Sequence, residues 1–426
     1  MIIKCLKGGR VVDPANKIDE EKDIYFGDGK ILNFSDQSDS KDIEIIDVRE
    51  KIIFPGLIDL RTHLKYITSE KGENISSLTK AASAGGYTTI MLMPDTDSRA
   101  DNPGAIQYVQ DRINNEALIN VLVCGCLTKD ASGEKLAPLG SFREINVKAI
   151  SDCPQSIQDN QIFAKGVEYA SMFNLPVIDL PRDFSLSSHG VAHDGPVALK
   201  MGLGGYPRIA EELFVQRAIS VANSLGTRIH LSSISSSGSV DMIREAKKRN
   251  VSISADVTPH HLFLTEKSIS EYNPNFKTSP PLREEKDRKS LINGLFDGTI
   301  DSISSAHQPY EEHIKNVEYD LSPPGVIGIQ TALSASYECL KDEKNFSWLK
   351  LISFLSTNAA KILSLDIPSF ESGKNANIVI FDPHKKWSFN KSTSLSNASN
   401  CPFDNFQFNG RIEKTFMNGH LIFDSN

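Results

Sequence analysis

Eight short apolar segments constrain the fold of this chain more than any other feature. Each has the length of a buried strand, and several are separated by stretches with a helical spacing of apolar residues. The segments are residues 57–61, 88–93, 120–123, 148–151, 175–179, 228–232, 252–256 and 300–304. Eight strands that alternate with helices predict an α/β chain folded as a (β/α)8 TIM barrel of parallel strands.

The stretches between these strands support the barrel. Helices are predicted at 75–84, at 207–223 and at 239–249, and Phe214 and Ala218 show the four-residue spacing of one buried helical face. A doubly wound sheet is the rival architecture, but no Gly-x-Gly-x-x-Gly follows the first strand. The glycines at 202–205 are interpreted as a flexible loop before a helix.

The two ends of the chain differ from its middle. Residues 1–54 and 370–426 contain short strand-like runs with turns between them and no long helical pattern. We therefore expect a small β-sandwich domain built from both termini, with residues 55–369 forming the barrel.

Composition excludes several classes of protein. With 426 residues, 39% of them hydrophobic and 23% charged, the chain can form one large core. A net charge of -8 without a basic patch argues against nucleic acid as a partner.

The chain has no signal-peptide pattern and no run of about twenty apolar residues, so we expect a cytoplasmic protein without membrane contact. Its six scattered cysteines are expected to be buried free thiols.

In a barrel of parallel strands, the working residues follow the carboxyl end of each strand. Here these positions form a polar rim with a depleted centre. A two-metal hydrolytic site needs several His and carboxylate ligands, and three protein ligands are the usual minimum for one catalytic metal. Only His63 and Asp152 stand in obvious ligand positions.

Motifs along nearly the whole chain, from Ile2 to about Asp424, carry a family resemblance. They are residues 54–60 (FPGLIDL), 81–89 (AASAGGYTT), 93–96 (MPDT), 258–262 (TPHHL), 279–283 (SPPLR), 324–332 (PGVIGIQTA), 358–363 (NAAKIL) and 400–403 (NCPF). In these motifs the chain resembles the bacterial class I dihydroorotases of the amidohydrolase superfamily. The resemblance implies a zinc-centred site that interconverts dihydroorotate and N-carbamoyl-aspartate.

The resemblance fails at the residues that perform the chemistry. Where the family has His-x-His-x-Arg, this chain has Arg61, His63 and Lys65, so one metal ligand is lost. Three further metal-ligand positions of the family, one of them also the general base, are occupied by Leu180, Ser233 and Ala306. The family's metal-bridging acid survives as Asp152. The other positions that the family uses for substrate are occupied by Asp95, Ser279, Arg283 and His307.

These replacements predict loss of the reaction. Without ligands no metal is held, and without a metal the attacking water keeps a pKa near that of bulk water. Ala306 cannot accept the proton. We therefore expect no cofactor, with zinc only if an unusual site exists. A buried Asp152 needs a cation, so an ion pair between Arg61 and Asp152 is predicted where a metal would lie.

Several other residues have an ordinary structural interpretation. His260 and His261 are expected to orient a loop or a neighbouring strand, and His189 and His193 to face solvent. For Arg283, binding of an anion and a role in an interface are equally favoured.

Three functional hypotheses follow. The first is a non-catalytic dihydroorotase homologue of pyrimidine biosynthesis that acts as a scaffold or partner of aspartate carbamoyltransferase, and we expect it to be a homo-oligomer. The second is an active amidohydrolase with an unusual mononuclear metal site that uses ligands such as Asp183, His189 or His307. The third is a structural or binding role without a partner enzyme.

Overall fold

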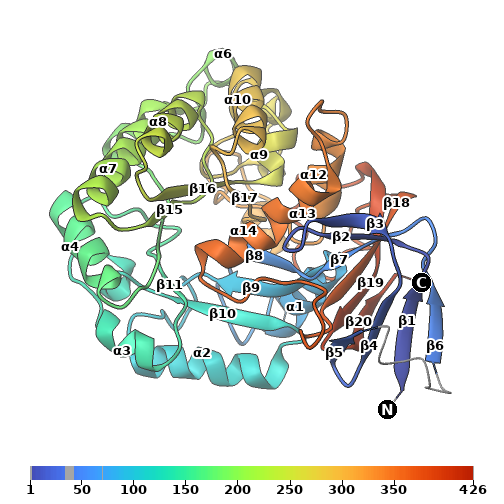
Figure 1. Ribbon diagram of the computed structural model, residues 1–426. Coiled ribbons are helices and arrows are strands. Elements are labelled where there is room, and N and C mark those ends of the chain that lie inside the picture. Colours follow the sequence, from blue (N-terminus) through green and yellow to red (C-terminus); the bar gives the residue numbers. More distant parts are fainter. Residues whose placement is uncertain (1, 34–42, 70, 426) are drawn as a thin grey trace.

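The computed structural model describes residues 2–33, 43–69 and 71–425. At its centre lies a sheet of eight strands in the order β17-β16-β15-β12-β11-β10-β9-β8, with parallel pairing throughout. A parallel bridge between Thr62 and His307 joins the first strand to the segment after the last one. The strands therefore close into a barrel, around which the helices are arranged (Figure 1).

The eight predicted strands are all present, with ends shifted by one or two residues. They are β8 (Leu57–Thr62), β9 (Tyr87–Leu92), β10 (Asn120–Gly125), β11 (Ala149–Ile150), β12 (Val177–Asp179), β15 (Ile229–Leu231), β16 (Ile253–Val257) and β17 (Ser302–Ile303). A further short pair is formed by β13 (Ala192–His193) and β14 (Gly205–Tyr206). Gly205 therefore belongs to a strand, whereas a flexible loop was predicted there.

Alternate residues of the barrel strands belong to different clusters. Leu57 and Ile90 pack in the large cluster with the surrounding helices. Ile58, Leu60 and Met91 pack with residues of neighbouring strands and of one C-terminal helix. Because successive side chains of a strand point to opposite faces, both faces are buried. This explains why the strands are nearly continuous apolar runs in the sequence.

The helices follow the sequence signals closely. The predicted helix 75–84 is α1, and it begins after Asn74, whose side chain accepts the backbone N–H of Ser77 at 3.0 Å. The predicted helices 207–223 and 239–249 correspond to α7 and α8. The helices are α1 (Ile75–Ala84), α2 (Pro103–Glu116), α3 (Leu139–Glu144), α4 (Asn160–Ser171), α5 (Phe184–Ser187), α6 (Pro196–Met201), α7 (Ile209–Leu225), α8 (Ser237–Lys248), α9 (Pro259–Phe263), α10 (Glu285–Phe296), α11 (Glu312–Lys315), α12 (Ala332–Leu340), α13 (Trp348–Leu355) and α14 (Thr357–Ile362), with short 3-10 turns η2 (Lys129–Ala131), η3 (Glu266–Ile269) and η4 (Pro274–Phe276).

Strands from the two ends of the chain form two further sheets, in the orders β5-β4-β1-β6 and β20-β19-β18-β7-β2-β3. Their bounds are β1 (Ile3–Lys7), β2 (Arg10–Asp13), β3 (Ile18–Glu21), β4 (Ile24–Gly27), β5 (Lys30–Leu32), β6 (Ile43–Asp47), β7 (Ile52–Pro55), β18 (Ile378–Ser388), β19 (Gln407–Met417) and β20 (His420–Asp424). From the sequence, the N-terminal strands are predicted at 2–6, 9–12, 23–26 and 30–34, so β3, β6 and β7 were not predicted. The last residue of the predicted strand 30–34 lies outside the described residues. In Figure 1 the blue N-terminal and red C-terminal strands lie together beside the barrel.

The two terminal sheets share one small core. It includes Leu6 and Phe26 of one sheet and Ile378 and Phe416 of the other, and the rings of Phe26 and Phe416 lie 5.4 Å apart in an edge-on contact. The predicted barrel with a β-sandwich built from both termini is therefore confirmed. The exact domain boundaries, 1–54 with 370–426 and 55–369, stay a prediction.

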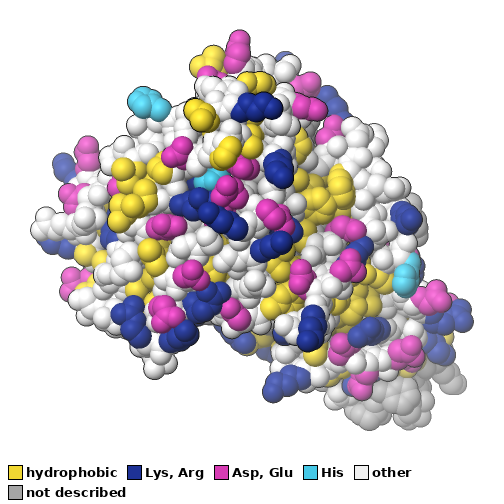
Figure 2. Space-filling model, turned by 90° about the horizontal axis from the view of Figure 1, so that it is seen from above, with side chains coloured by type: hydrophobic (Ala, Val, Ile, Leu, Met, Phe, Trp, Pro, Cys, Tyr) yellow, Lys and Arg dark blue, Asp and Glu magenta, His cyan; other side chains and the backbone are white. Residues whose placement is uncertain are grey.

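The surface and the cysteines add little to the fold. On the face seen in Figure 2, basic and acidic side chains are interspersed and apolar side chains gather in several patches. No helix in the described part of the chain combines the length and apolarity needed to cross a bilayer. The six cysteines are free, and all but Cys339 are buried, as predicted.

Candidate functional site

The barrel mouth, where the strands end, brings the predicted site residues together. Arg61 is the fifth residue of β8, and His63 follows that strand. Asp152 follows β11, and Leu180 follows β12. Arg61 is 2% exposed, His63 is 1% exposed and Ser233, beyond β15, is 1% exposed. The centre of the mouth is therefore filled by protein side chains.

Arg61 joins two of the positions at which the resemblance places metal ligands. Its Nε–H donates to Nε2 of His63 at 3.0 Å, and one terminal N–H donates to Oγ of Ser233 at 2.7 Å. On its other side, His63 Nδ1 lies 2.9 Å from Oδ1 of Asp95. A guanidinium thus connects the ends of the first and sixth barrel strands through hydrogen bonds to neutral acceptors.

Two opposing influences act on the proton of His63. Burial disfavours the charged imidazole and acts to lower the pKa of His63, whereas the charge of the nearby Asp95 carboxylate acts to raise it. The hydrogen bond from Arg61 opposes protonation of His63 at Nε2. That nitrogen can accept the Arg61 N–H only while it carries no proton of its own. A guanidinium always keeps its hydrogens, so this geometry favours a neutral His63 with its proton on Nδ1, facing Asp95.

The predicted ion pair between Arg61 and Asp152 is wrong. Asp152 Oδ1 accepts the backbone N–H groups of Leu127 at 2.8 Å and Thr128 at 3.0 Å, and the Thr128 hydroxyl donates to Oδ2. Within the described ranges, no cation lies within 4.0 Å of this carboxylate. Burial raises the pKa of Asp152 to about 6, against the effect of these donors. Local backbone donors replaced the expected cation, which a strand pattern does not reveal.

Two replaced ligand positions have an unusual backbone. Ser233 has a φ of 57° and Ala306 a φ of 48°, both in the left-handed region. Asp, Asn and His tolerate this region better than most other residues. The residue types that the family pattern has here, His and Asp, suit that backbone.

His307 is buried at the mouth and has one unused nitrogen. Its Nδ1 accepts the backbone N–H of Gly328 at 3.3 Å, which places the ring proton on Nε2. Nε2 has no hydrogen-bond partner in the structure. Burial lowers the pKa of His307 to about 3, so the ring is neutral.

A second polar network lies deeper in the barrel. His230 contacts Ser254 Oγ through Nδ1 and Asp256 Oδ2 through Nε2, each at 2.9 Å. Burial raises the pKa of Asp256, but the hydrogen bond and charge of His230 outweigh it and leave the pKa lowered. Asp256 also accepts the backbone N–H of Ser233 at 2.8 Å. His230 therefore supports the backbone of the mouth and does not open onto it.

The two histidines of the 258–262 motif have a structural role, as predicted. His261 Nδ1 lies 2.7 Å from the Thr258 hydroxyl, and its Nε2 donates to the Pro280 carbonyl at 3.2 Å. The rings of His260 and His261 are 4.8 Å apart. Burial lowers the pKa of both rings, that of His261 to about 4. They fasten the loop after β16 to the segment that contains Pro280.

Arg283, for which anion binding or an interface role was predicted, has partners inside the protein. The side chain is buried, and it donates to Ser235 Oγ at 3.0 Å and to the Tyr206 carbonyl at 2.8 Å. One terminal nitrogen lies 3.7 Å from the buried carboxylate of Glu211. Its charge is therefore compensated inside the protein, and neither an anion nor an interface is needed to explain it.

The remaining predicted substrate positions lie at the edge of the mouth. Lys65 is exposed, and its Nζ lies 5.3 Å from the ring centroid of Tyr66. Ser279 Oγ accepts a hydrogen bond from Arg182 at 3.3 Å. Arg182 also donates to Ser187, so it fastens two loops together. The Asp95 carboxylate is hydrogen-bonded to the His63 ring.

Comparison with known proteins shows the family to which the chain belongs. Residues 50–239 match the family model described as dihydro-orotase-like, and residues 205–422 match that of the amidohydrolase family. The chain is 36% identical to a dihydroorotase of Endomicrobium trichonymphae, with 98% of each chain covered. It is 34% identical to a dihydroorotase of Citrifermentans bemidjiense, with 99% of each covered. The chain belongs to the dihydroorotase family.

Solved structures confirm the fold of this dihydroorotase-family protein. An L-hydantoinase (dihydropyrimidinase) from Arthrobacter aurescens superimposes with a TM-score of 0.86 at 18% identity, covering 100% of this chain and 96% of that one. A D-hydantoinase superimposes with a TM-score of 0.84 at 20% identity, covering 98% and 95%. At this identity the likeness shows the barrel and its β-rich companion alone.

The zinc that the dihydroorotase resemblance implies does not fit the donors at the mouth. Leu180 and Ala306 have no ligand atom, and Arg61 carries a positive charge where a ligand would stand. His63 Nε2, which could bind a metal, accepts the hydrogen of Arg61. The mouth of this family member thus holds a side-chain cation among its former ligand positions.

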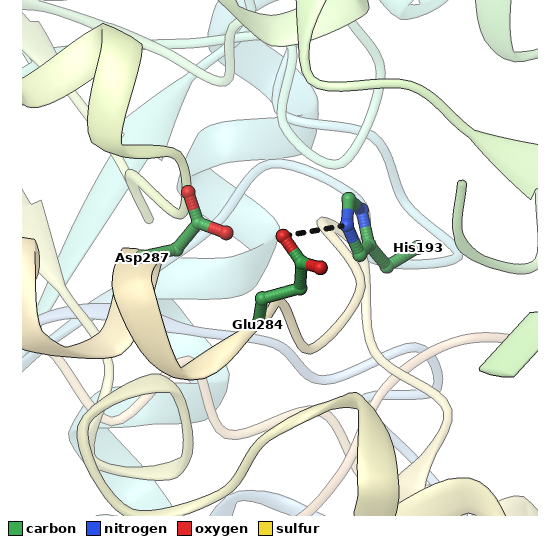
Figure 3. A group of neighbouring side chains, drawn as sticks. All are labelled: His193, Glu284 and Asp287. Carbon is green, nitrogen blue, oxygen red and sulfur yellow. Dashed lines mark ion pairs between the residues drawn. The ribbon is translucent and has the colours of Figure 1, made fainter. Parts of the chain in front are cut away.

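A different group of potential ligands was missed by the sequence. His193, Glu284 and Asp287 bring three ligand atoms within 4.8 Å of one another (Figure 3). Arg208 already pairs with both carboxylates, at 2.7 Å to Asp287 and in a short contact with Glu284. His193 Nδ1 accepts an N–H of Arg283 at 3.2 Å, which leaves the ring proton on Nε2, the atom that faces Glu284.

This arrangement argues against a metal at His193. A metal-binding imidazole needs an unprotonated nitrogen toward the ion and normally donates with the other one. Burial and the charges of Arg283 and Arg208 lower the pKa of His193 to about 4. The ring is 1% exposed, so the prediction that His193 faces solvent is wrong, whereas His189 is exposed as predicted.

Proposed function

We propose that this protein is a non-catalytic member of the dihydroorotase family that acts in pyrimidine biosynthesis as a structural partner of aspartate carbamoyltransferase. A cytoplasmic location and assembly into a homo-oligomer are parts of the same proposal. Relatives named dihydroorotase match it over nearly their full length, which supports the pathway.

One observation carries the proposal. The Arg61 guanidinium donates to His63 and Ser233, two positions at which the family resemblance places metal ligands. A cation that is covalently part of the chain opposes binding of a second cation at the same place. It cannot lower the pKa of a water molecule as a coordinated metal does.

The general base is missing as well. Ala306 has no proton acceptor, and the neighbouring His307 keeps its proton on Nε2 and has a pKa lowered to about 3. Groups that act together in catalysis fail together, so one surviving carboxylate at Asp152 does not maintain the reaction. The fold remains intact around these losses, which is the pattern expected of a protein kept for its shape.

The deciding experiment mixes the purified protein with aspartate carbamoyltransferase from the same organism and measures the mass of the complex by light scattering. We expect a stoichiometric complex, and higher carbamoyltransferase activity or stability within it. The mass of the protein alone tests the homo-oligomer. If the two proteins elute separately at micromolar concentrations, the scaffold proposal fails.

Metal content and turnover test the catalytic alternative. The protein purified without chelator is expected to contain no stoichiometric zinc and to interconvert dihydroorotate and N-carbamoyl-aspartate no faster than buffer. Stoichiometric zinc together with turnover would establish instead an active amidohydrolase with a mononuclear site.

A further inference from the structure

A cavity of about 520 Å³ opens beside the barrel mouth, between η2 and the start of α4. Asp152, the surviving acid of the mouth, forms part of its wall. The cavity is not explained by the proposed scaffold role, which concerns the assembly of the protein. Its size is in the range of pockets that hold small organic molecules.

The inner end of this cavity offers acceptors for a donor. Asp152 and Ser156 both line it, and each is 5% exposed. Ser156 Oγ is buried and has no hydrogen-bond partner. Asp152 Oδ2 accepts one hydrogen bond, from Thr128, and a carboxylate oxygen can accept two. A buried hydroxyl without a partner is costly, so a bound group that reaches it gains stability.

The middle and the rim of the cavity differ from its inner end. Ile157, Ile162 and Phe184 contribute apolar surface to the lining, and the exposed carboxylates of Glu134 and Asp159 stand at the rim. The lining contains neither Lys nor Arg. The guanidinium of Arg182 lies 5.2 Å from the Phe184 ring, but it donates to Ser187 and Ser279 and is not part of the wall.

The order of groups along the cavity defines the ligand. Burial places the carboxylate of Asp152 and the hydroxyl of Ser156 inside and the carboxylates of Glu134 and Asp159 at the surface, and apolar side chains complete the lining. An inner ammonium would satisfy Asp152 and Ser156, an aliphatic stem would cover the apolar wall, and an outer ammonium would meet Glu134 or Asp159. We propose that this cavity binds an aliphatic diamine.

The test is isothermal titration of the full-length protein with putrescine, butylamine and butanediol, which share a four-carbon stem. It is carried out at about pH 8, where the amines of putrescine and butylamine are charged. We expect putrescine to bind most tightly, butylamine more weakly and butanediol not at all. Equal heats for all three compounds, or no binding of putrescine at millimolar concentration, would overturn the proposal.

Variants separate this cavity from general attraction to an acidic protein. Ser156→Ala is expected to weaken putrescine binding about tenfold, because a hydrogen bond to a charged group is lost. Glu134→Gln is expected to weaken putrescine about threefold and butylamine hardly at all, since it removes a rim charge. Glu144→Gln makes the same charge change at an exposed position outside the cavity and should leave binding unchanged.

Both lining substitutions involve side chains with few contacts, so folding is expected to survive. Thermal unfolding of each variant confirms this before titration. If Glu144→Gln weakens putrescine as much as Glu134→Gln does, the binding is non-specific and the proposal is wrong. The titration requires no partner enzyme and no turnover, so its result is independent of the proposed function.

Discussion

Two arginines in this molecule stand among potential metal ligands, and their surroundings differ. Arg208 lies between Glu284 and Asp287, with a direct ion pair to each carboxylate. Arg61 lies between His63 and Ser233, and in the part of the chain that the structure describes no carboxylate lies within 4.0 Å of it. The first is an ordinary buried ion-pair cluster. The second is a cation held by neutral groups where the family resemblance places a metal.

Two buried aspartates show the same contrast. Burial would raise the pKa of Asp287, but Arg208 outweighs it and holds that pKa below its usual range. Asp152 has only neutral donors, and burial raises its pKa to about 6. The difference teaches that a buried carboxylate can be held either by a cation or by backbone N–H groups, and that the two solutions respond to pH in opposite directions.

The largest expected effect comes from rebuilding the mouth. The combined change Arg61→His, Leu180→His, Ser233→His and Ala306→Asp installs the ligand types that the family resemblance implies. The left-handed backbone at Ser233 and Ala306 is one that His and Asp tolerate. We expect zinc binding in the micromolar range or tighter, about 8 kcal/mol. Metal analysis after dialysis measures it.

The single change Arg61→His is the control for the rebuilt mouth. It adds one imidazole but leaves Leu180, Ser233 and Ala306 in place, so zinc should stay below stoichiometric levels. Tight zinc binding by the unaltered protein would contradict the description of the mouth as a site in which Arg61 stands where the family resemblance places a metal.

Removal of Arg208 tests the other side of the comparison. Arg208→Ala leaves the fully buried Asp287 carboxylate without its partner. The free energy of unfolding is expected to fall by about 3 to 5 kcal/mol. Urea unfolding measures this loss. Arg143→Ala, which removes an exposed arginine, is the control and should change the free energy of unfolding by less than about 0.5 kcal/mol. A loss as small as that of the control would mean that the ion pairs are not formed.

The pH dependence of stability separates the two aspartates. Because the pKa of Asp152 is raised in the folded state, its contribution favours folding below its ordinary pKa and is lost as pH rises through about 6. Asparagine keeps the acceptor for Leu127 and Thr128 but does not ionise. Asp152→Asn should therefore remove a decline in stability of up to about 3 kcal/mol between about pH 4 and pH 6.

Urea unfolding at a series of pH values measures this effect, and Asp342→Asn, an exposed position, is the control. Asp287 has the opposite sign, since its stabilising effect is present above its ordinary pKa and is lost as pH falls. An unchanged pH profile in Asp152→Asn would show that this carboxylate is not buried as described.

The smallest effect is expected for Arg61→Ala. Hydrogen bonds to His63 and Ser233 are lost, but so is the cost of a buried guanidinium without a nearby carboxylate. The free energy of unfolding should fall by about 1 to 2 kcal/mol, clearly less than in Arg208→Ala. A loss as large as that of Arg208→Ala would erase the difference between the two arginines.

Arg61→Ala should also let His63 gain a proton near neutral pH, because the Asp95 carboxylate then acts on the ring without the opposing N–H of Arg61. Imidazole NMR shifts report this change.

The sequence predicted the strands and helices of the barrel well, because the patterns that specify them are local in the sequence. The eight apolar runs became the eight barrel strands, and the helix predicted at 75–84 is α1 with the same bounds. The depleted centre of the mouth was also visible, because each barrel strand delivers its next residues to one rim. Positions such as Arg61 and Ser233 could therefore be placed together from their distance to a strand end.

Contacts between side chains were predicted less well. Asp152 was paired with Arg61 on the basis of charge, yet its partners are backbone N–H groups of Leu127 and Thr128. For Arg283 an anion or an interface was expected as the partner of its charge, yet it lies beside the buried carboxylate of Glu211. Neither pairing follows from a motif, because the partners come from segments whose distance depends on the packing of loops.

The amino-acid sequence by itself determined the barrel and the β-sandwich made from both termini, which follow from strand periodicity. That Arg61, Leu180, Ser233 and Ala306 stand at metal-ligand positions is what the family resemblance implies. Only the tertiary structure decided what surrounds Arg61, which carboxylates have cations and where a cavity remains. Those outcomes depend on distances of a few ångströms between loops, at which burial and hydrogen bonding decide the charge of each group.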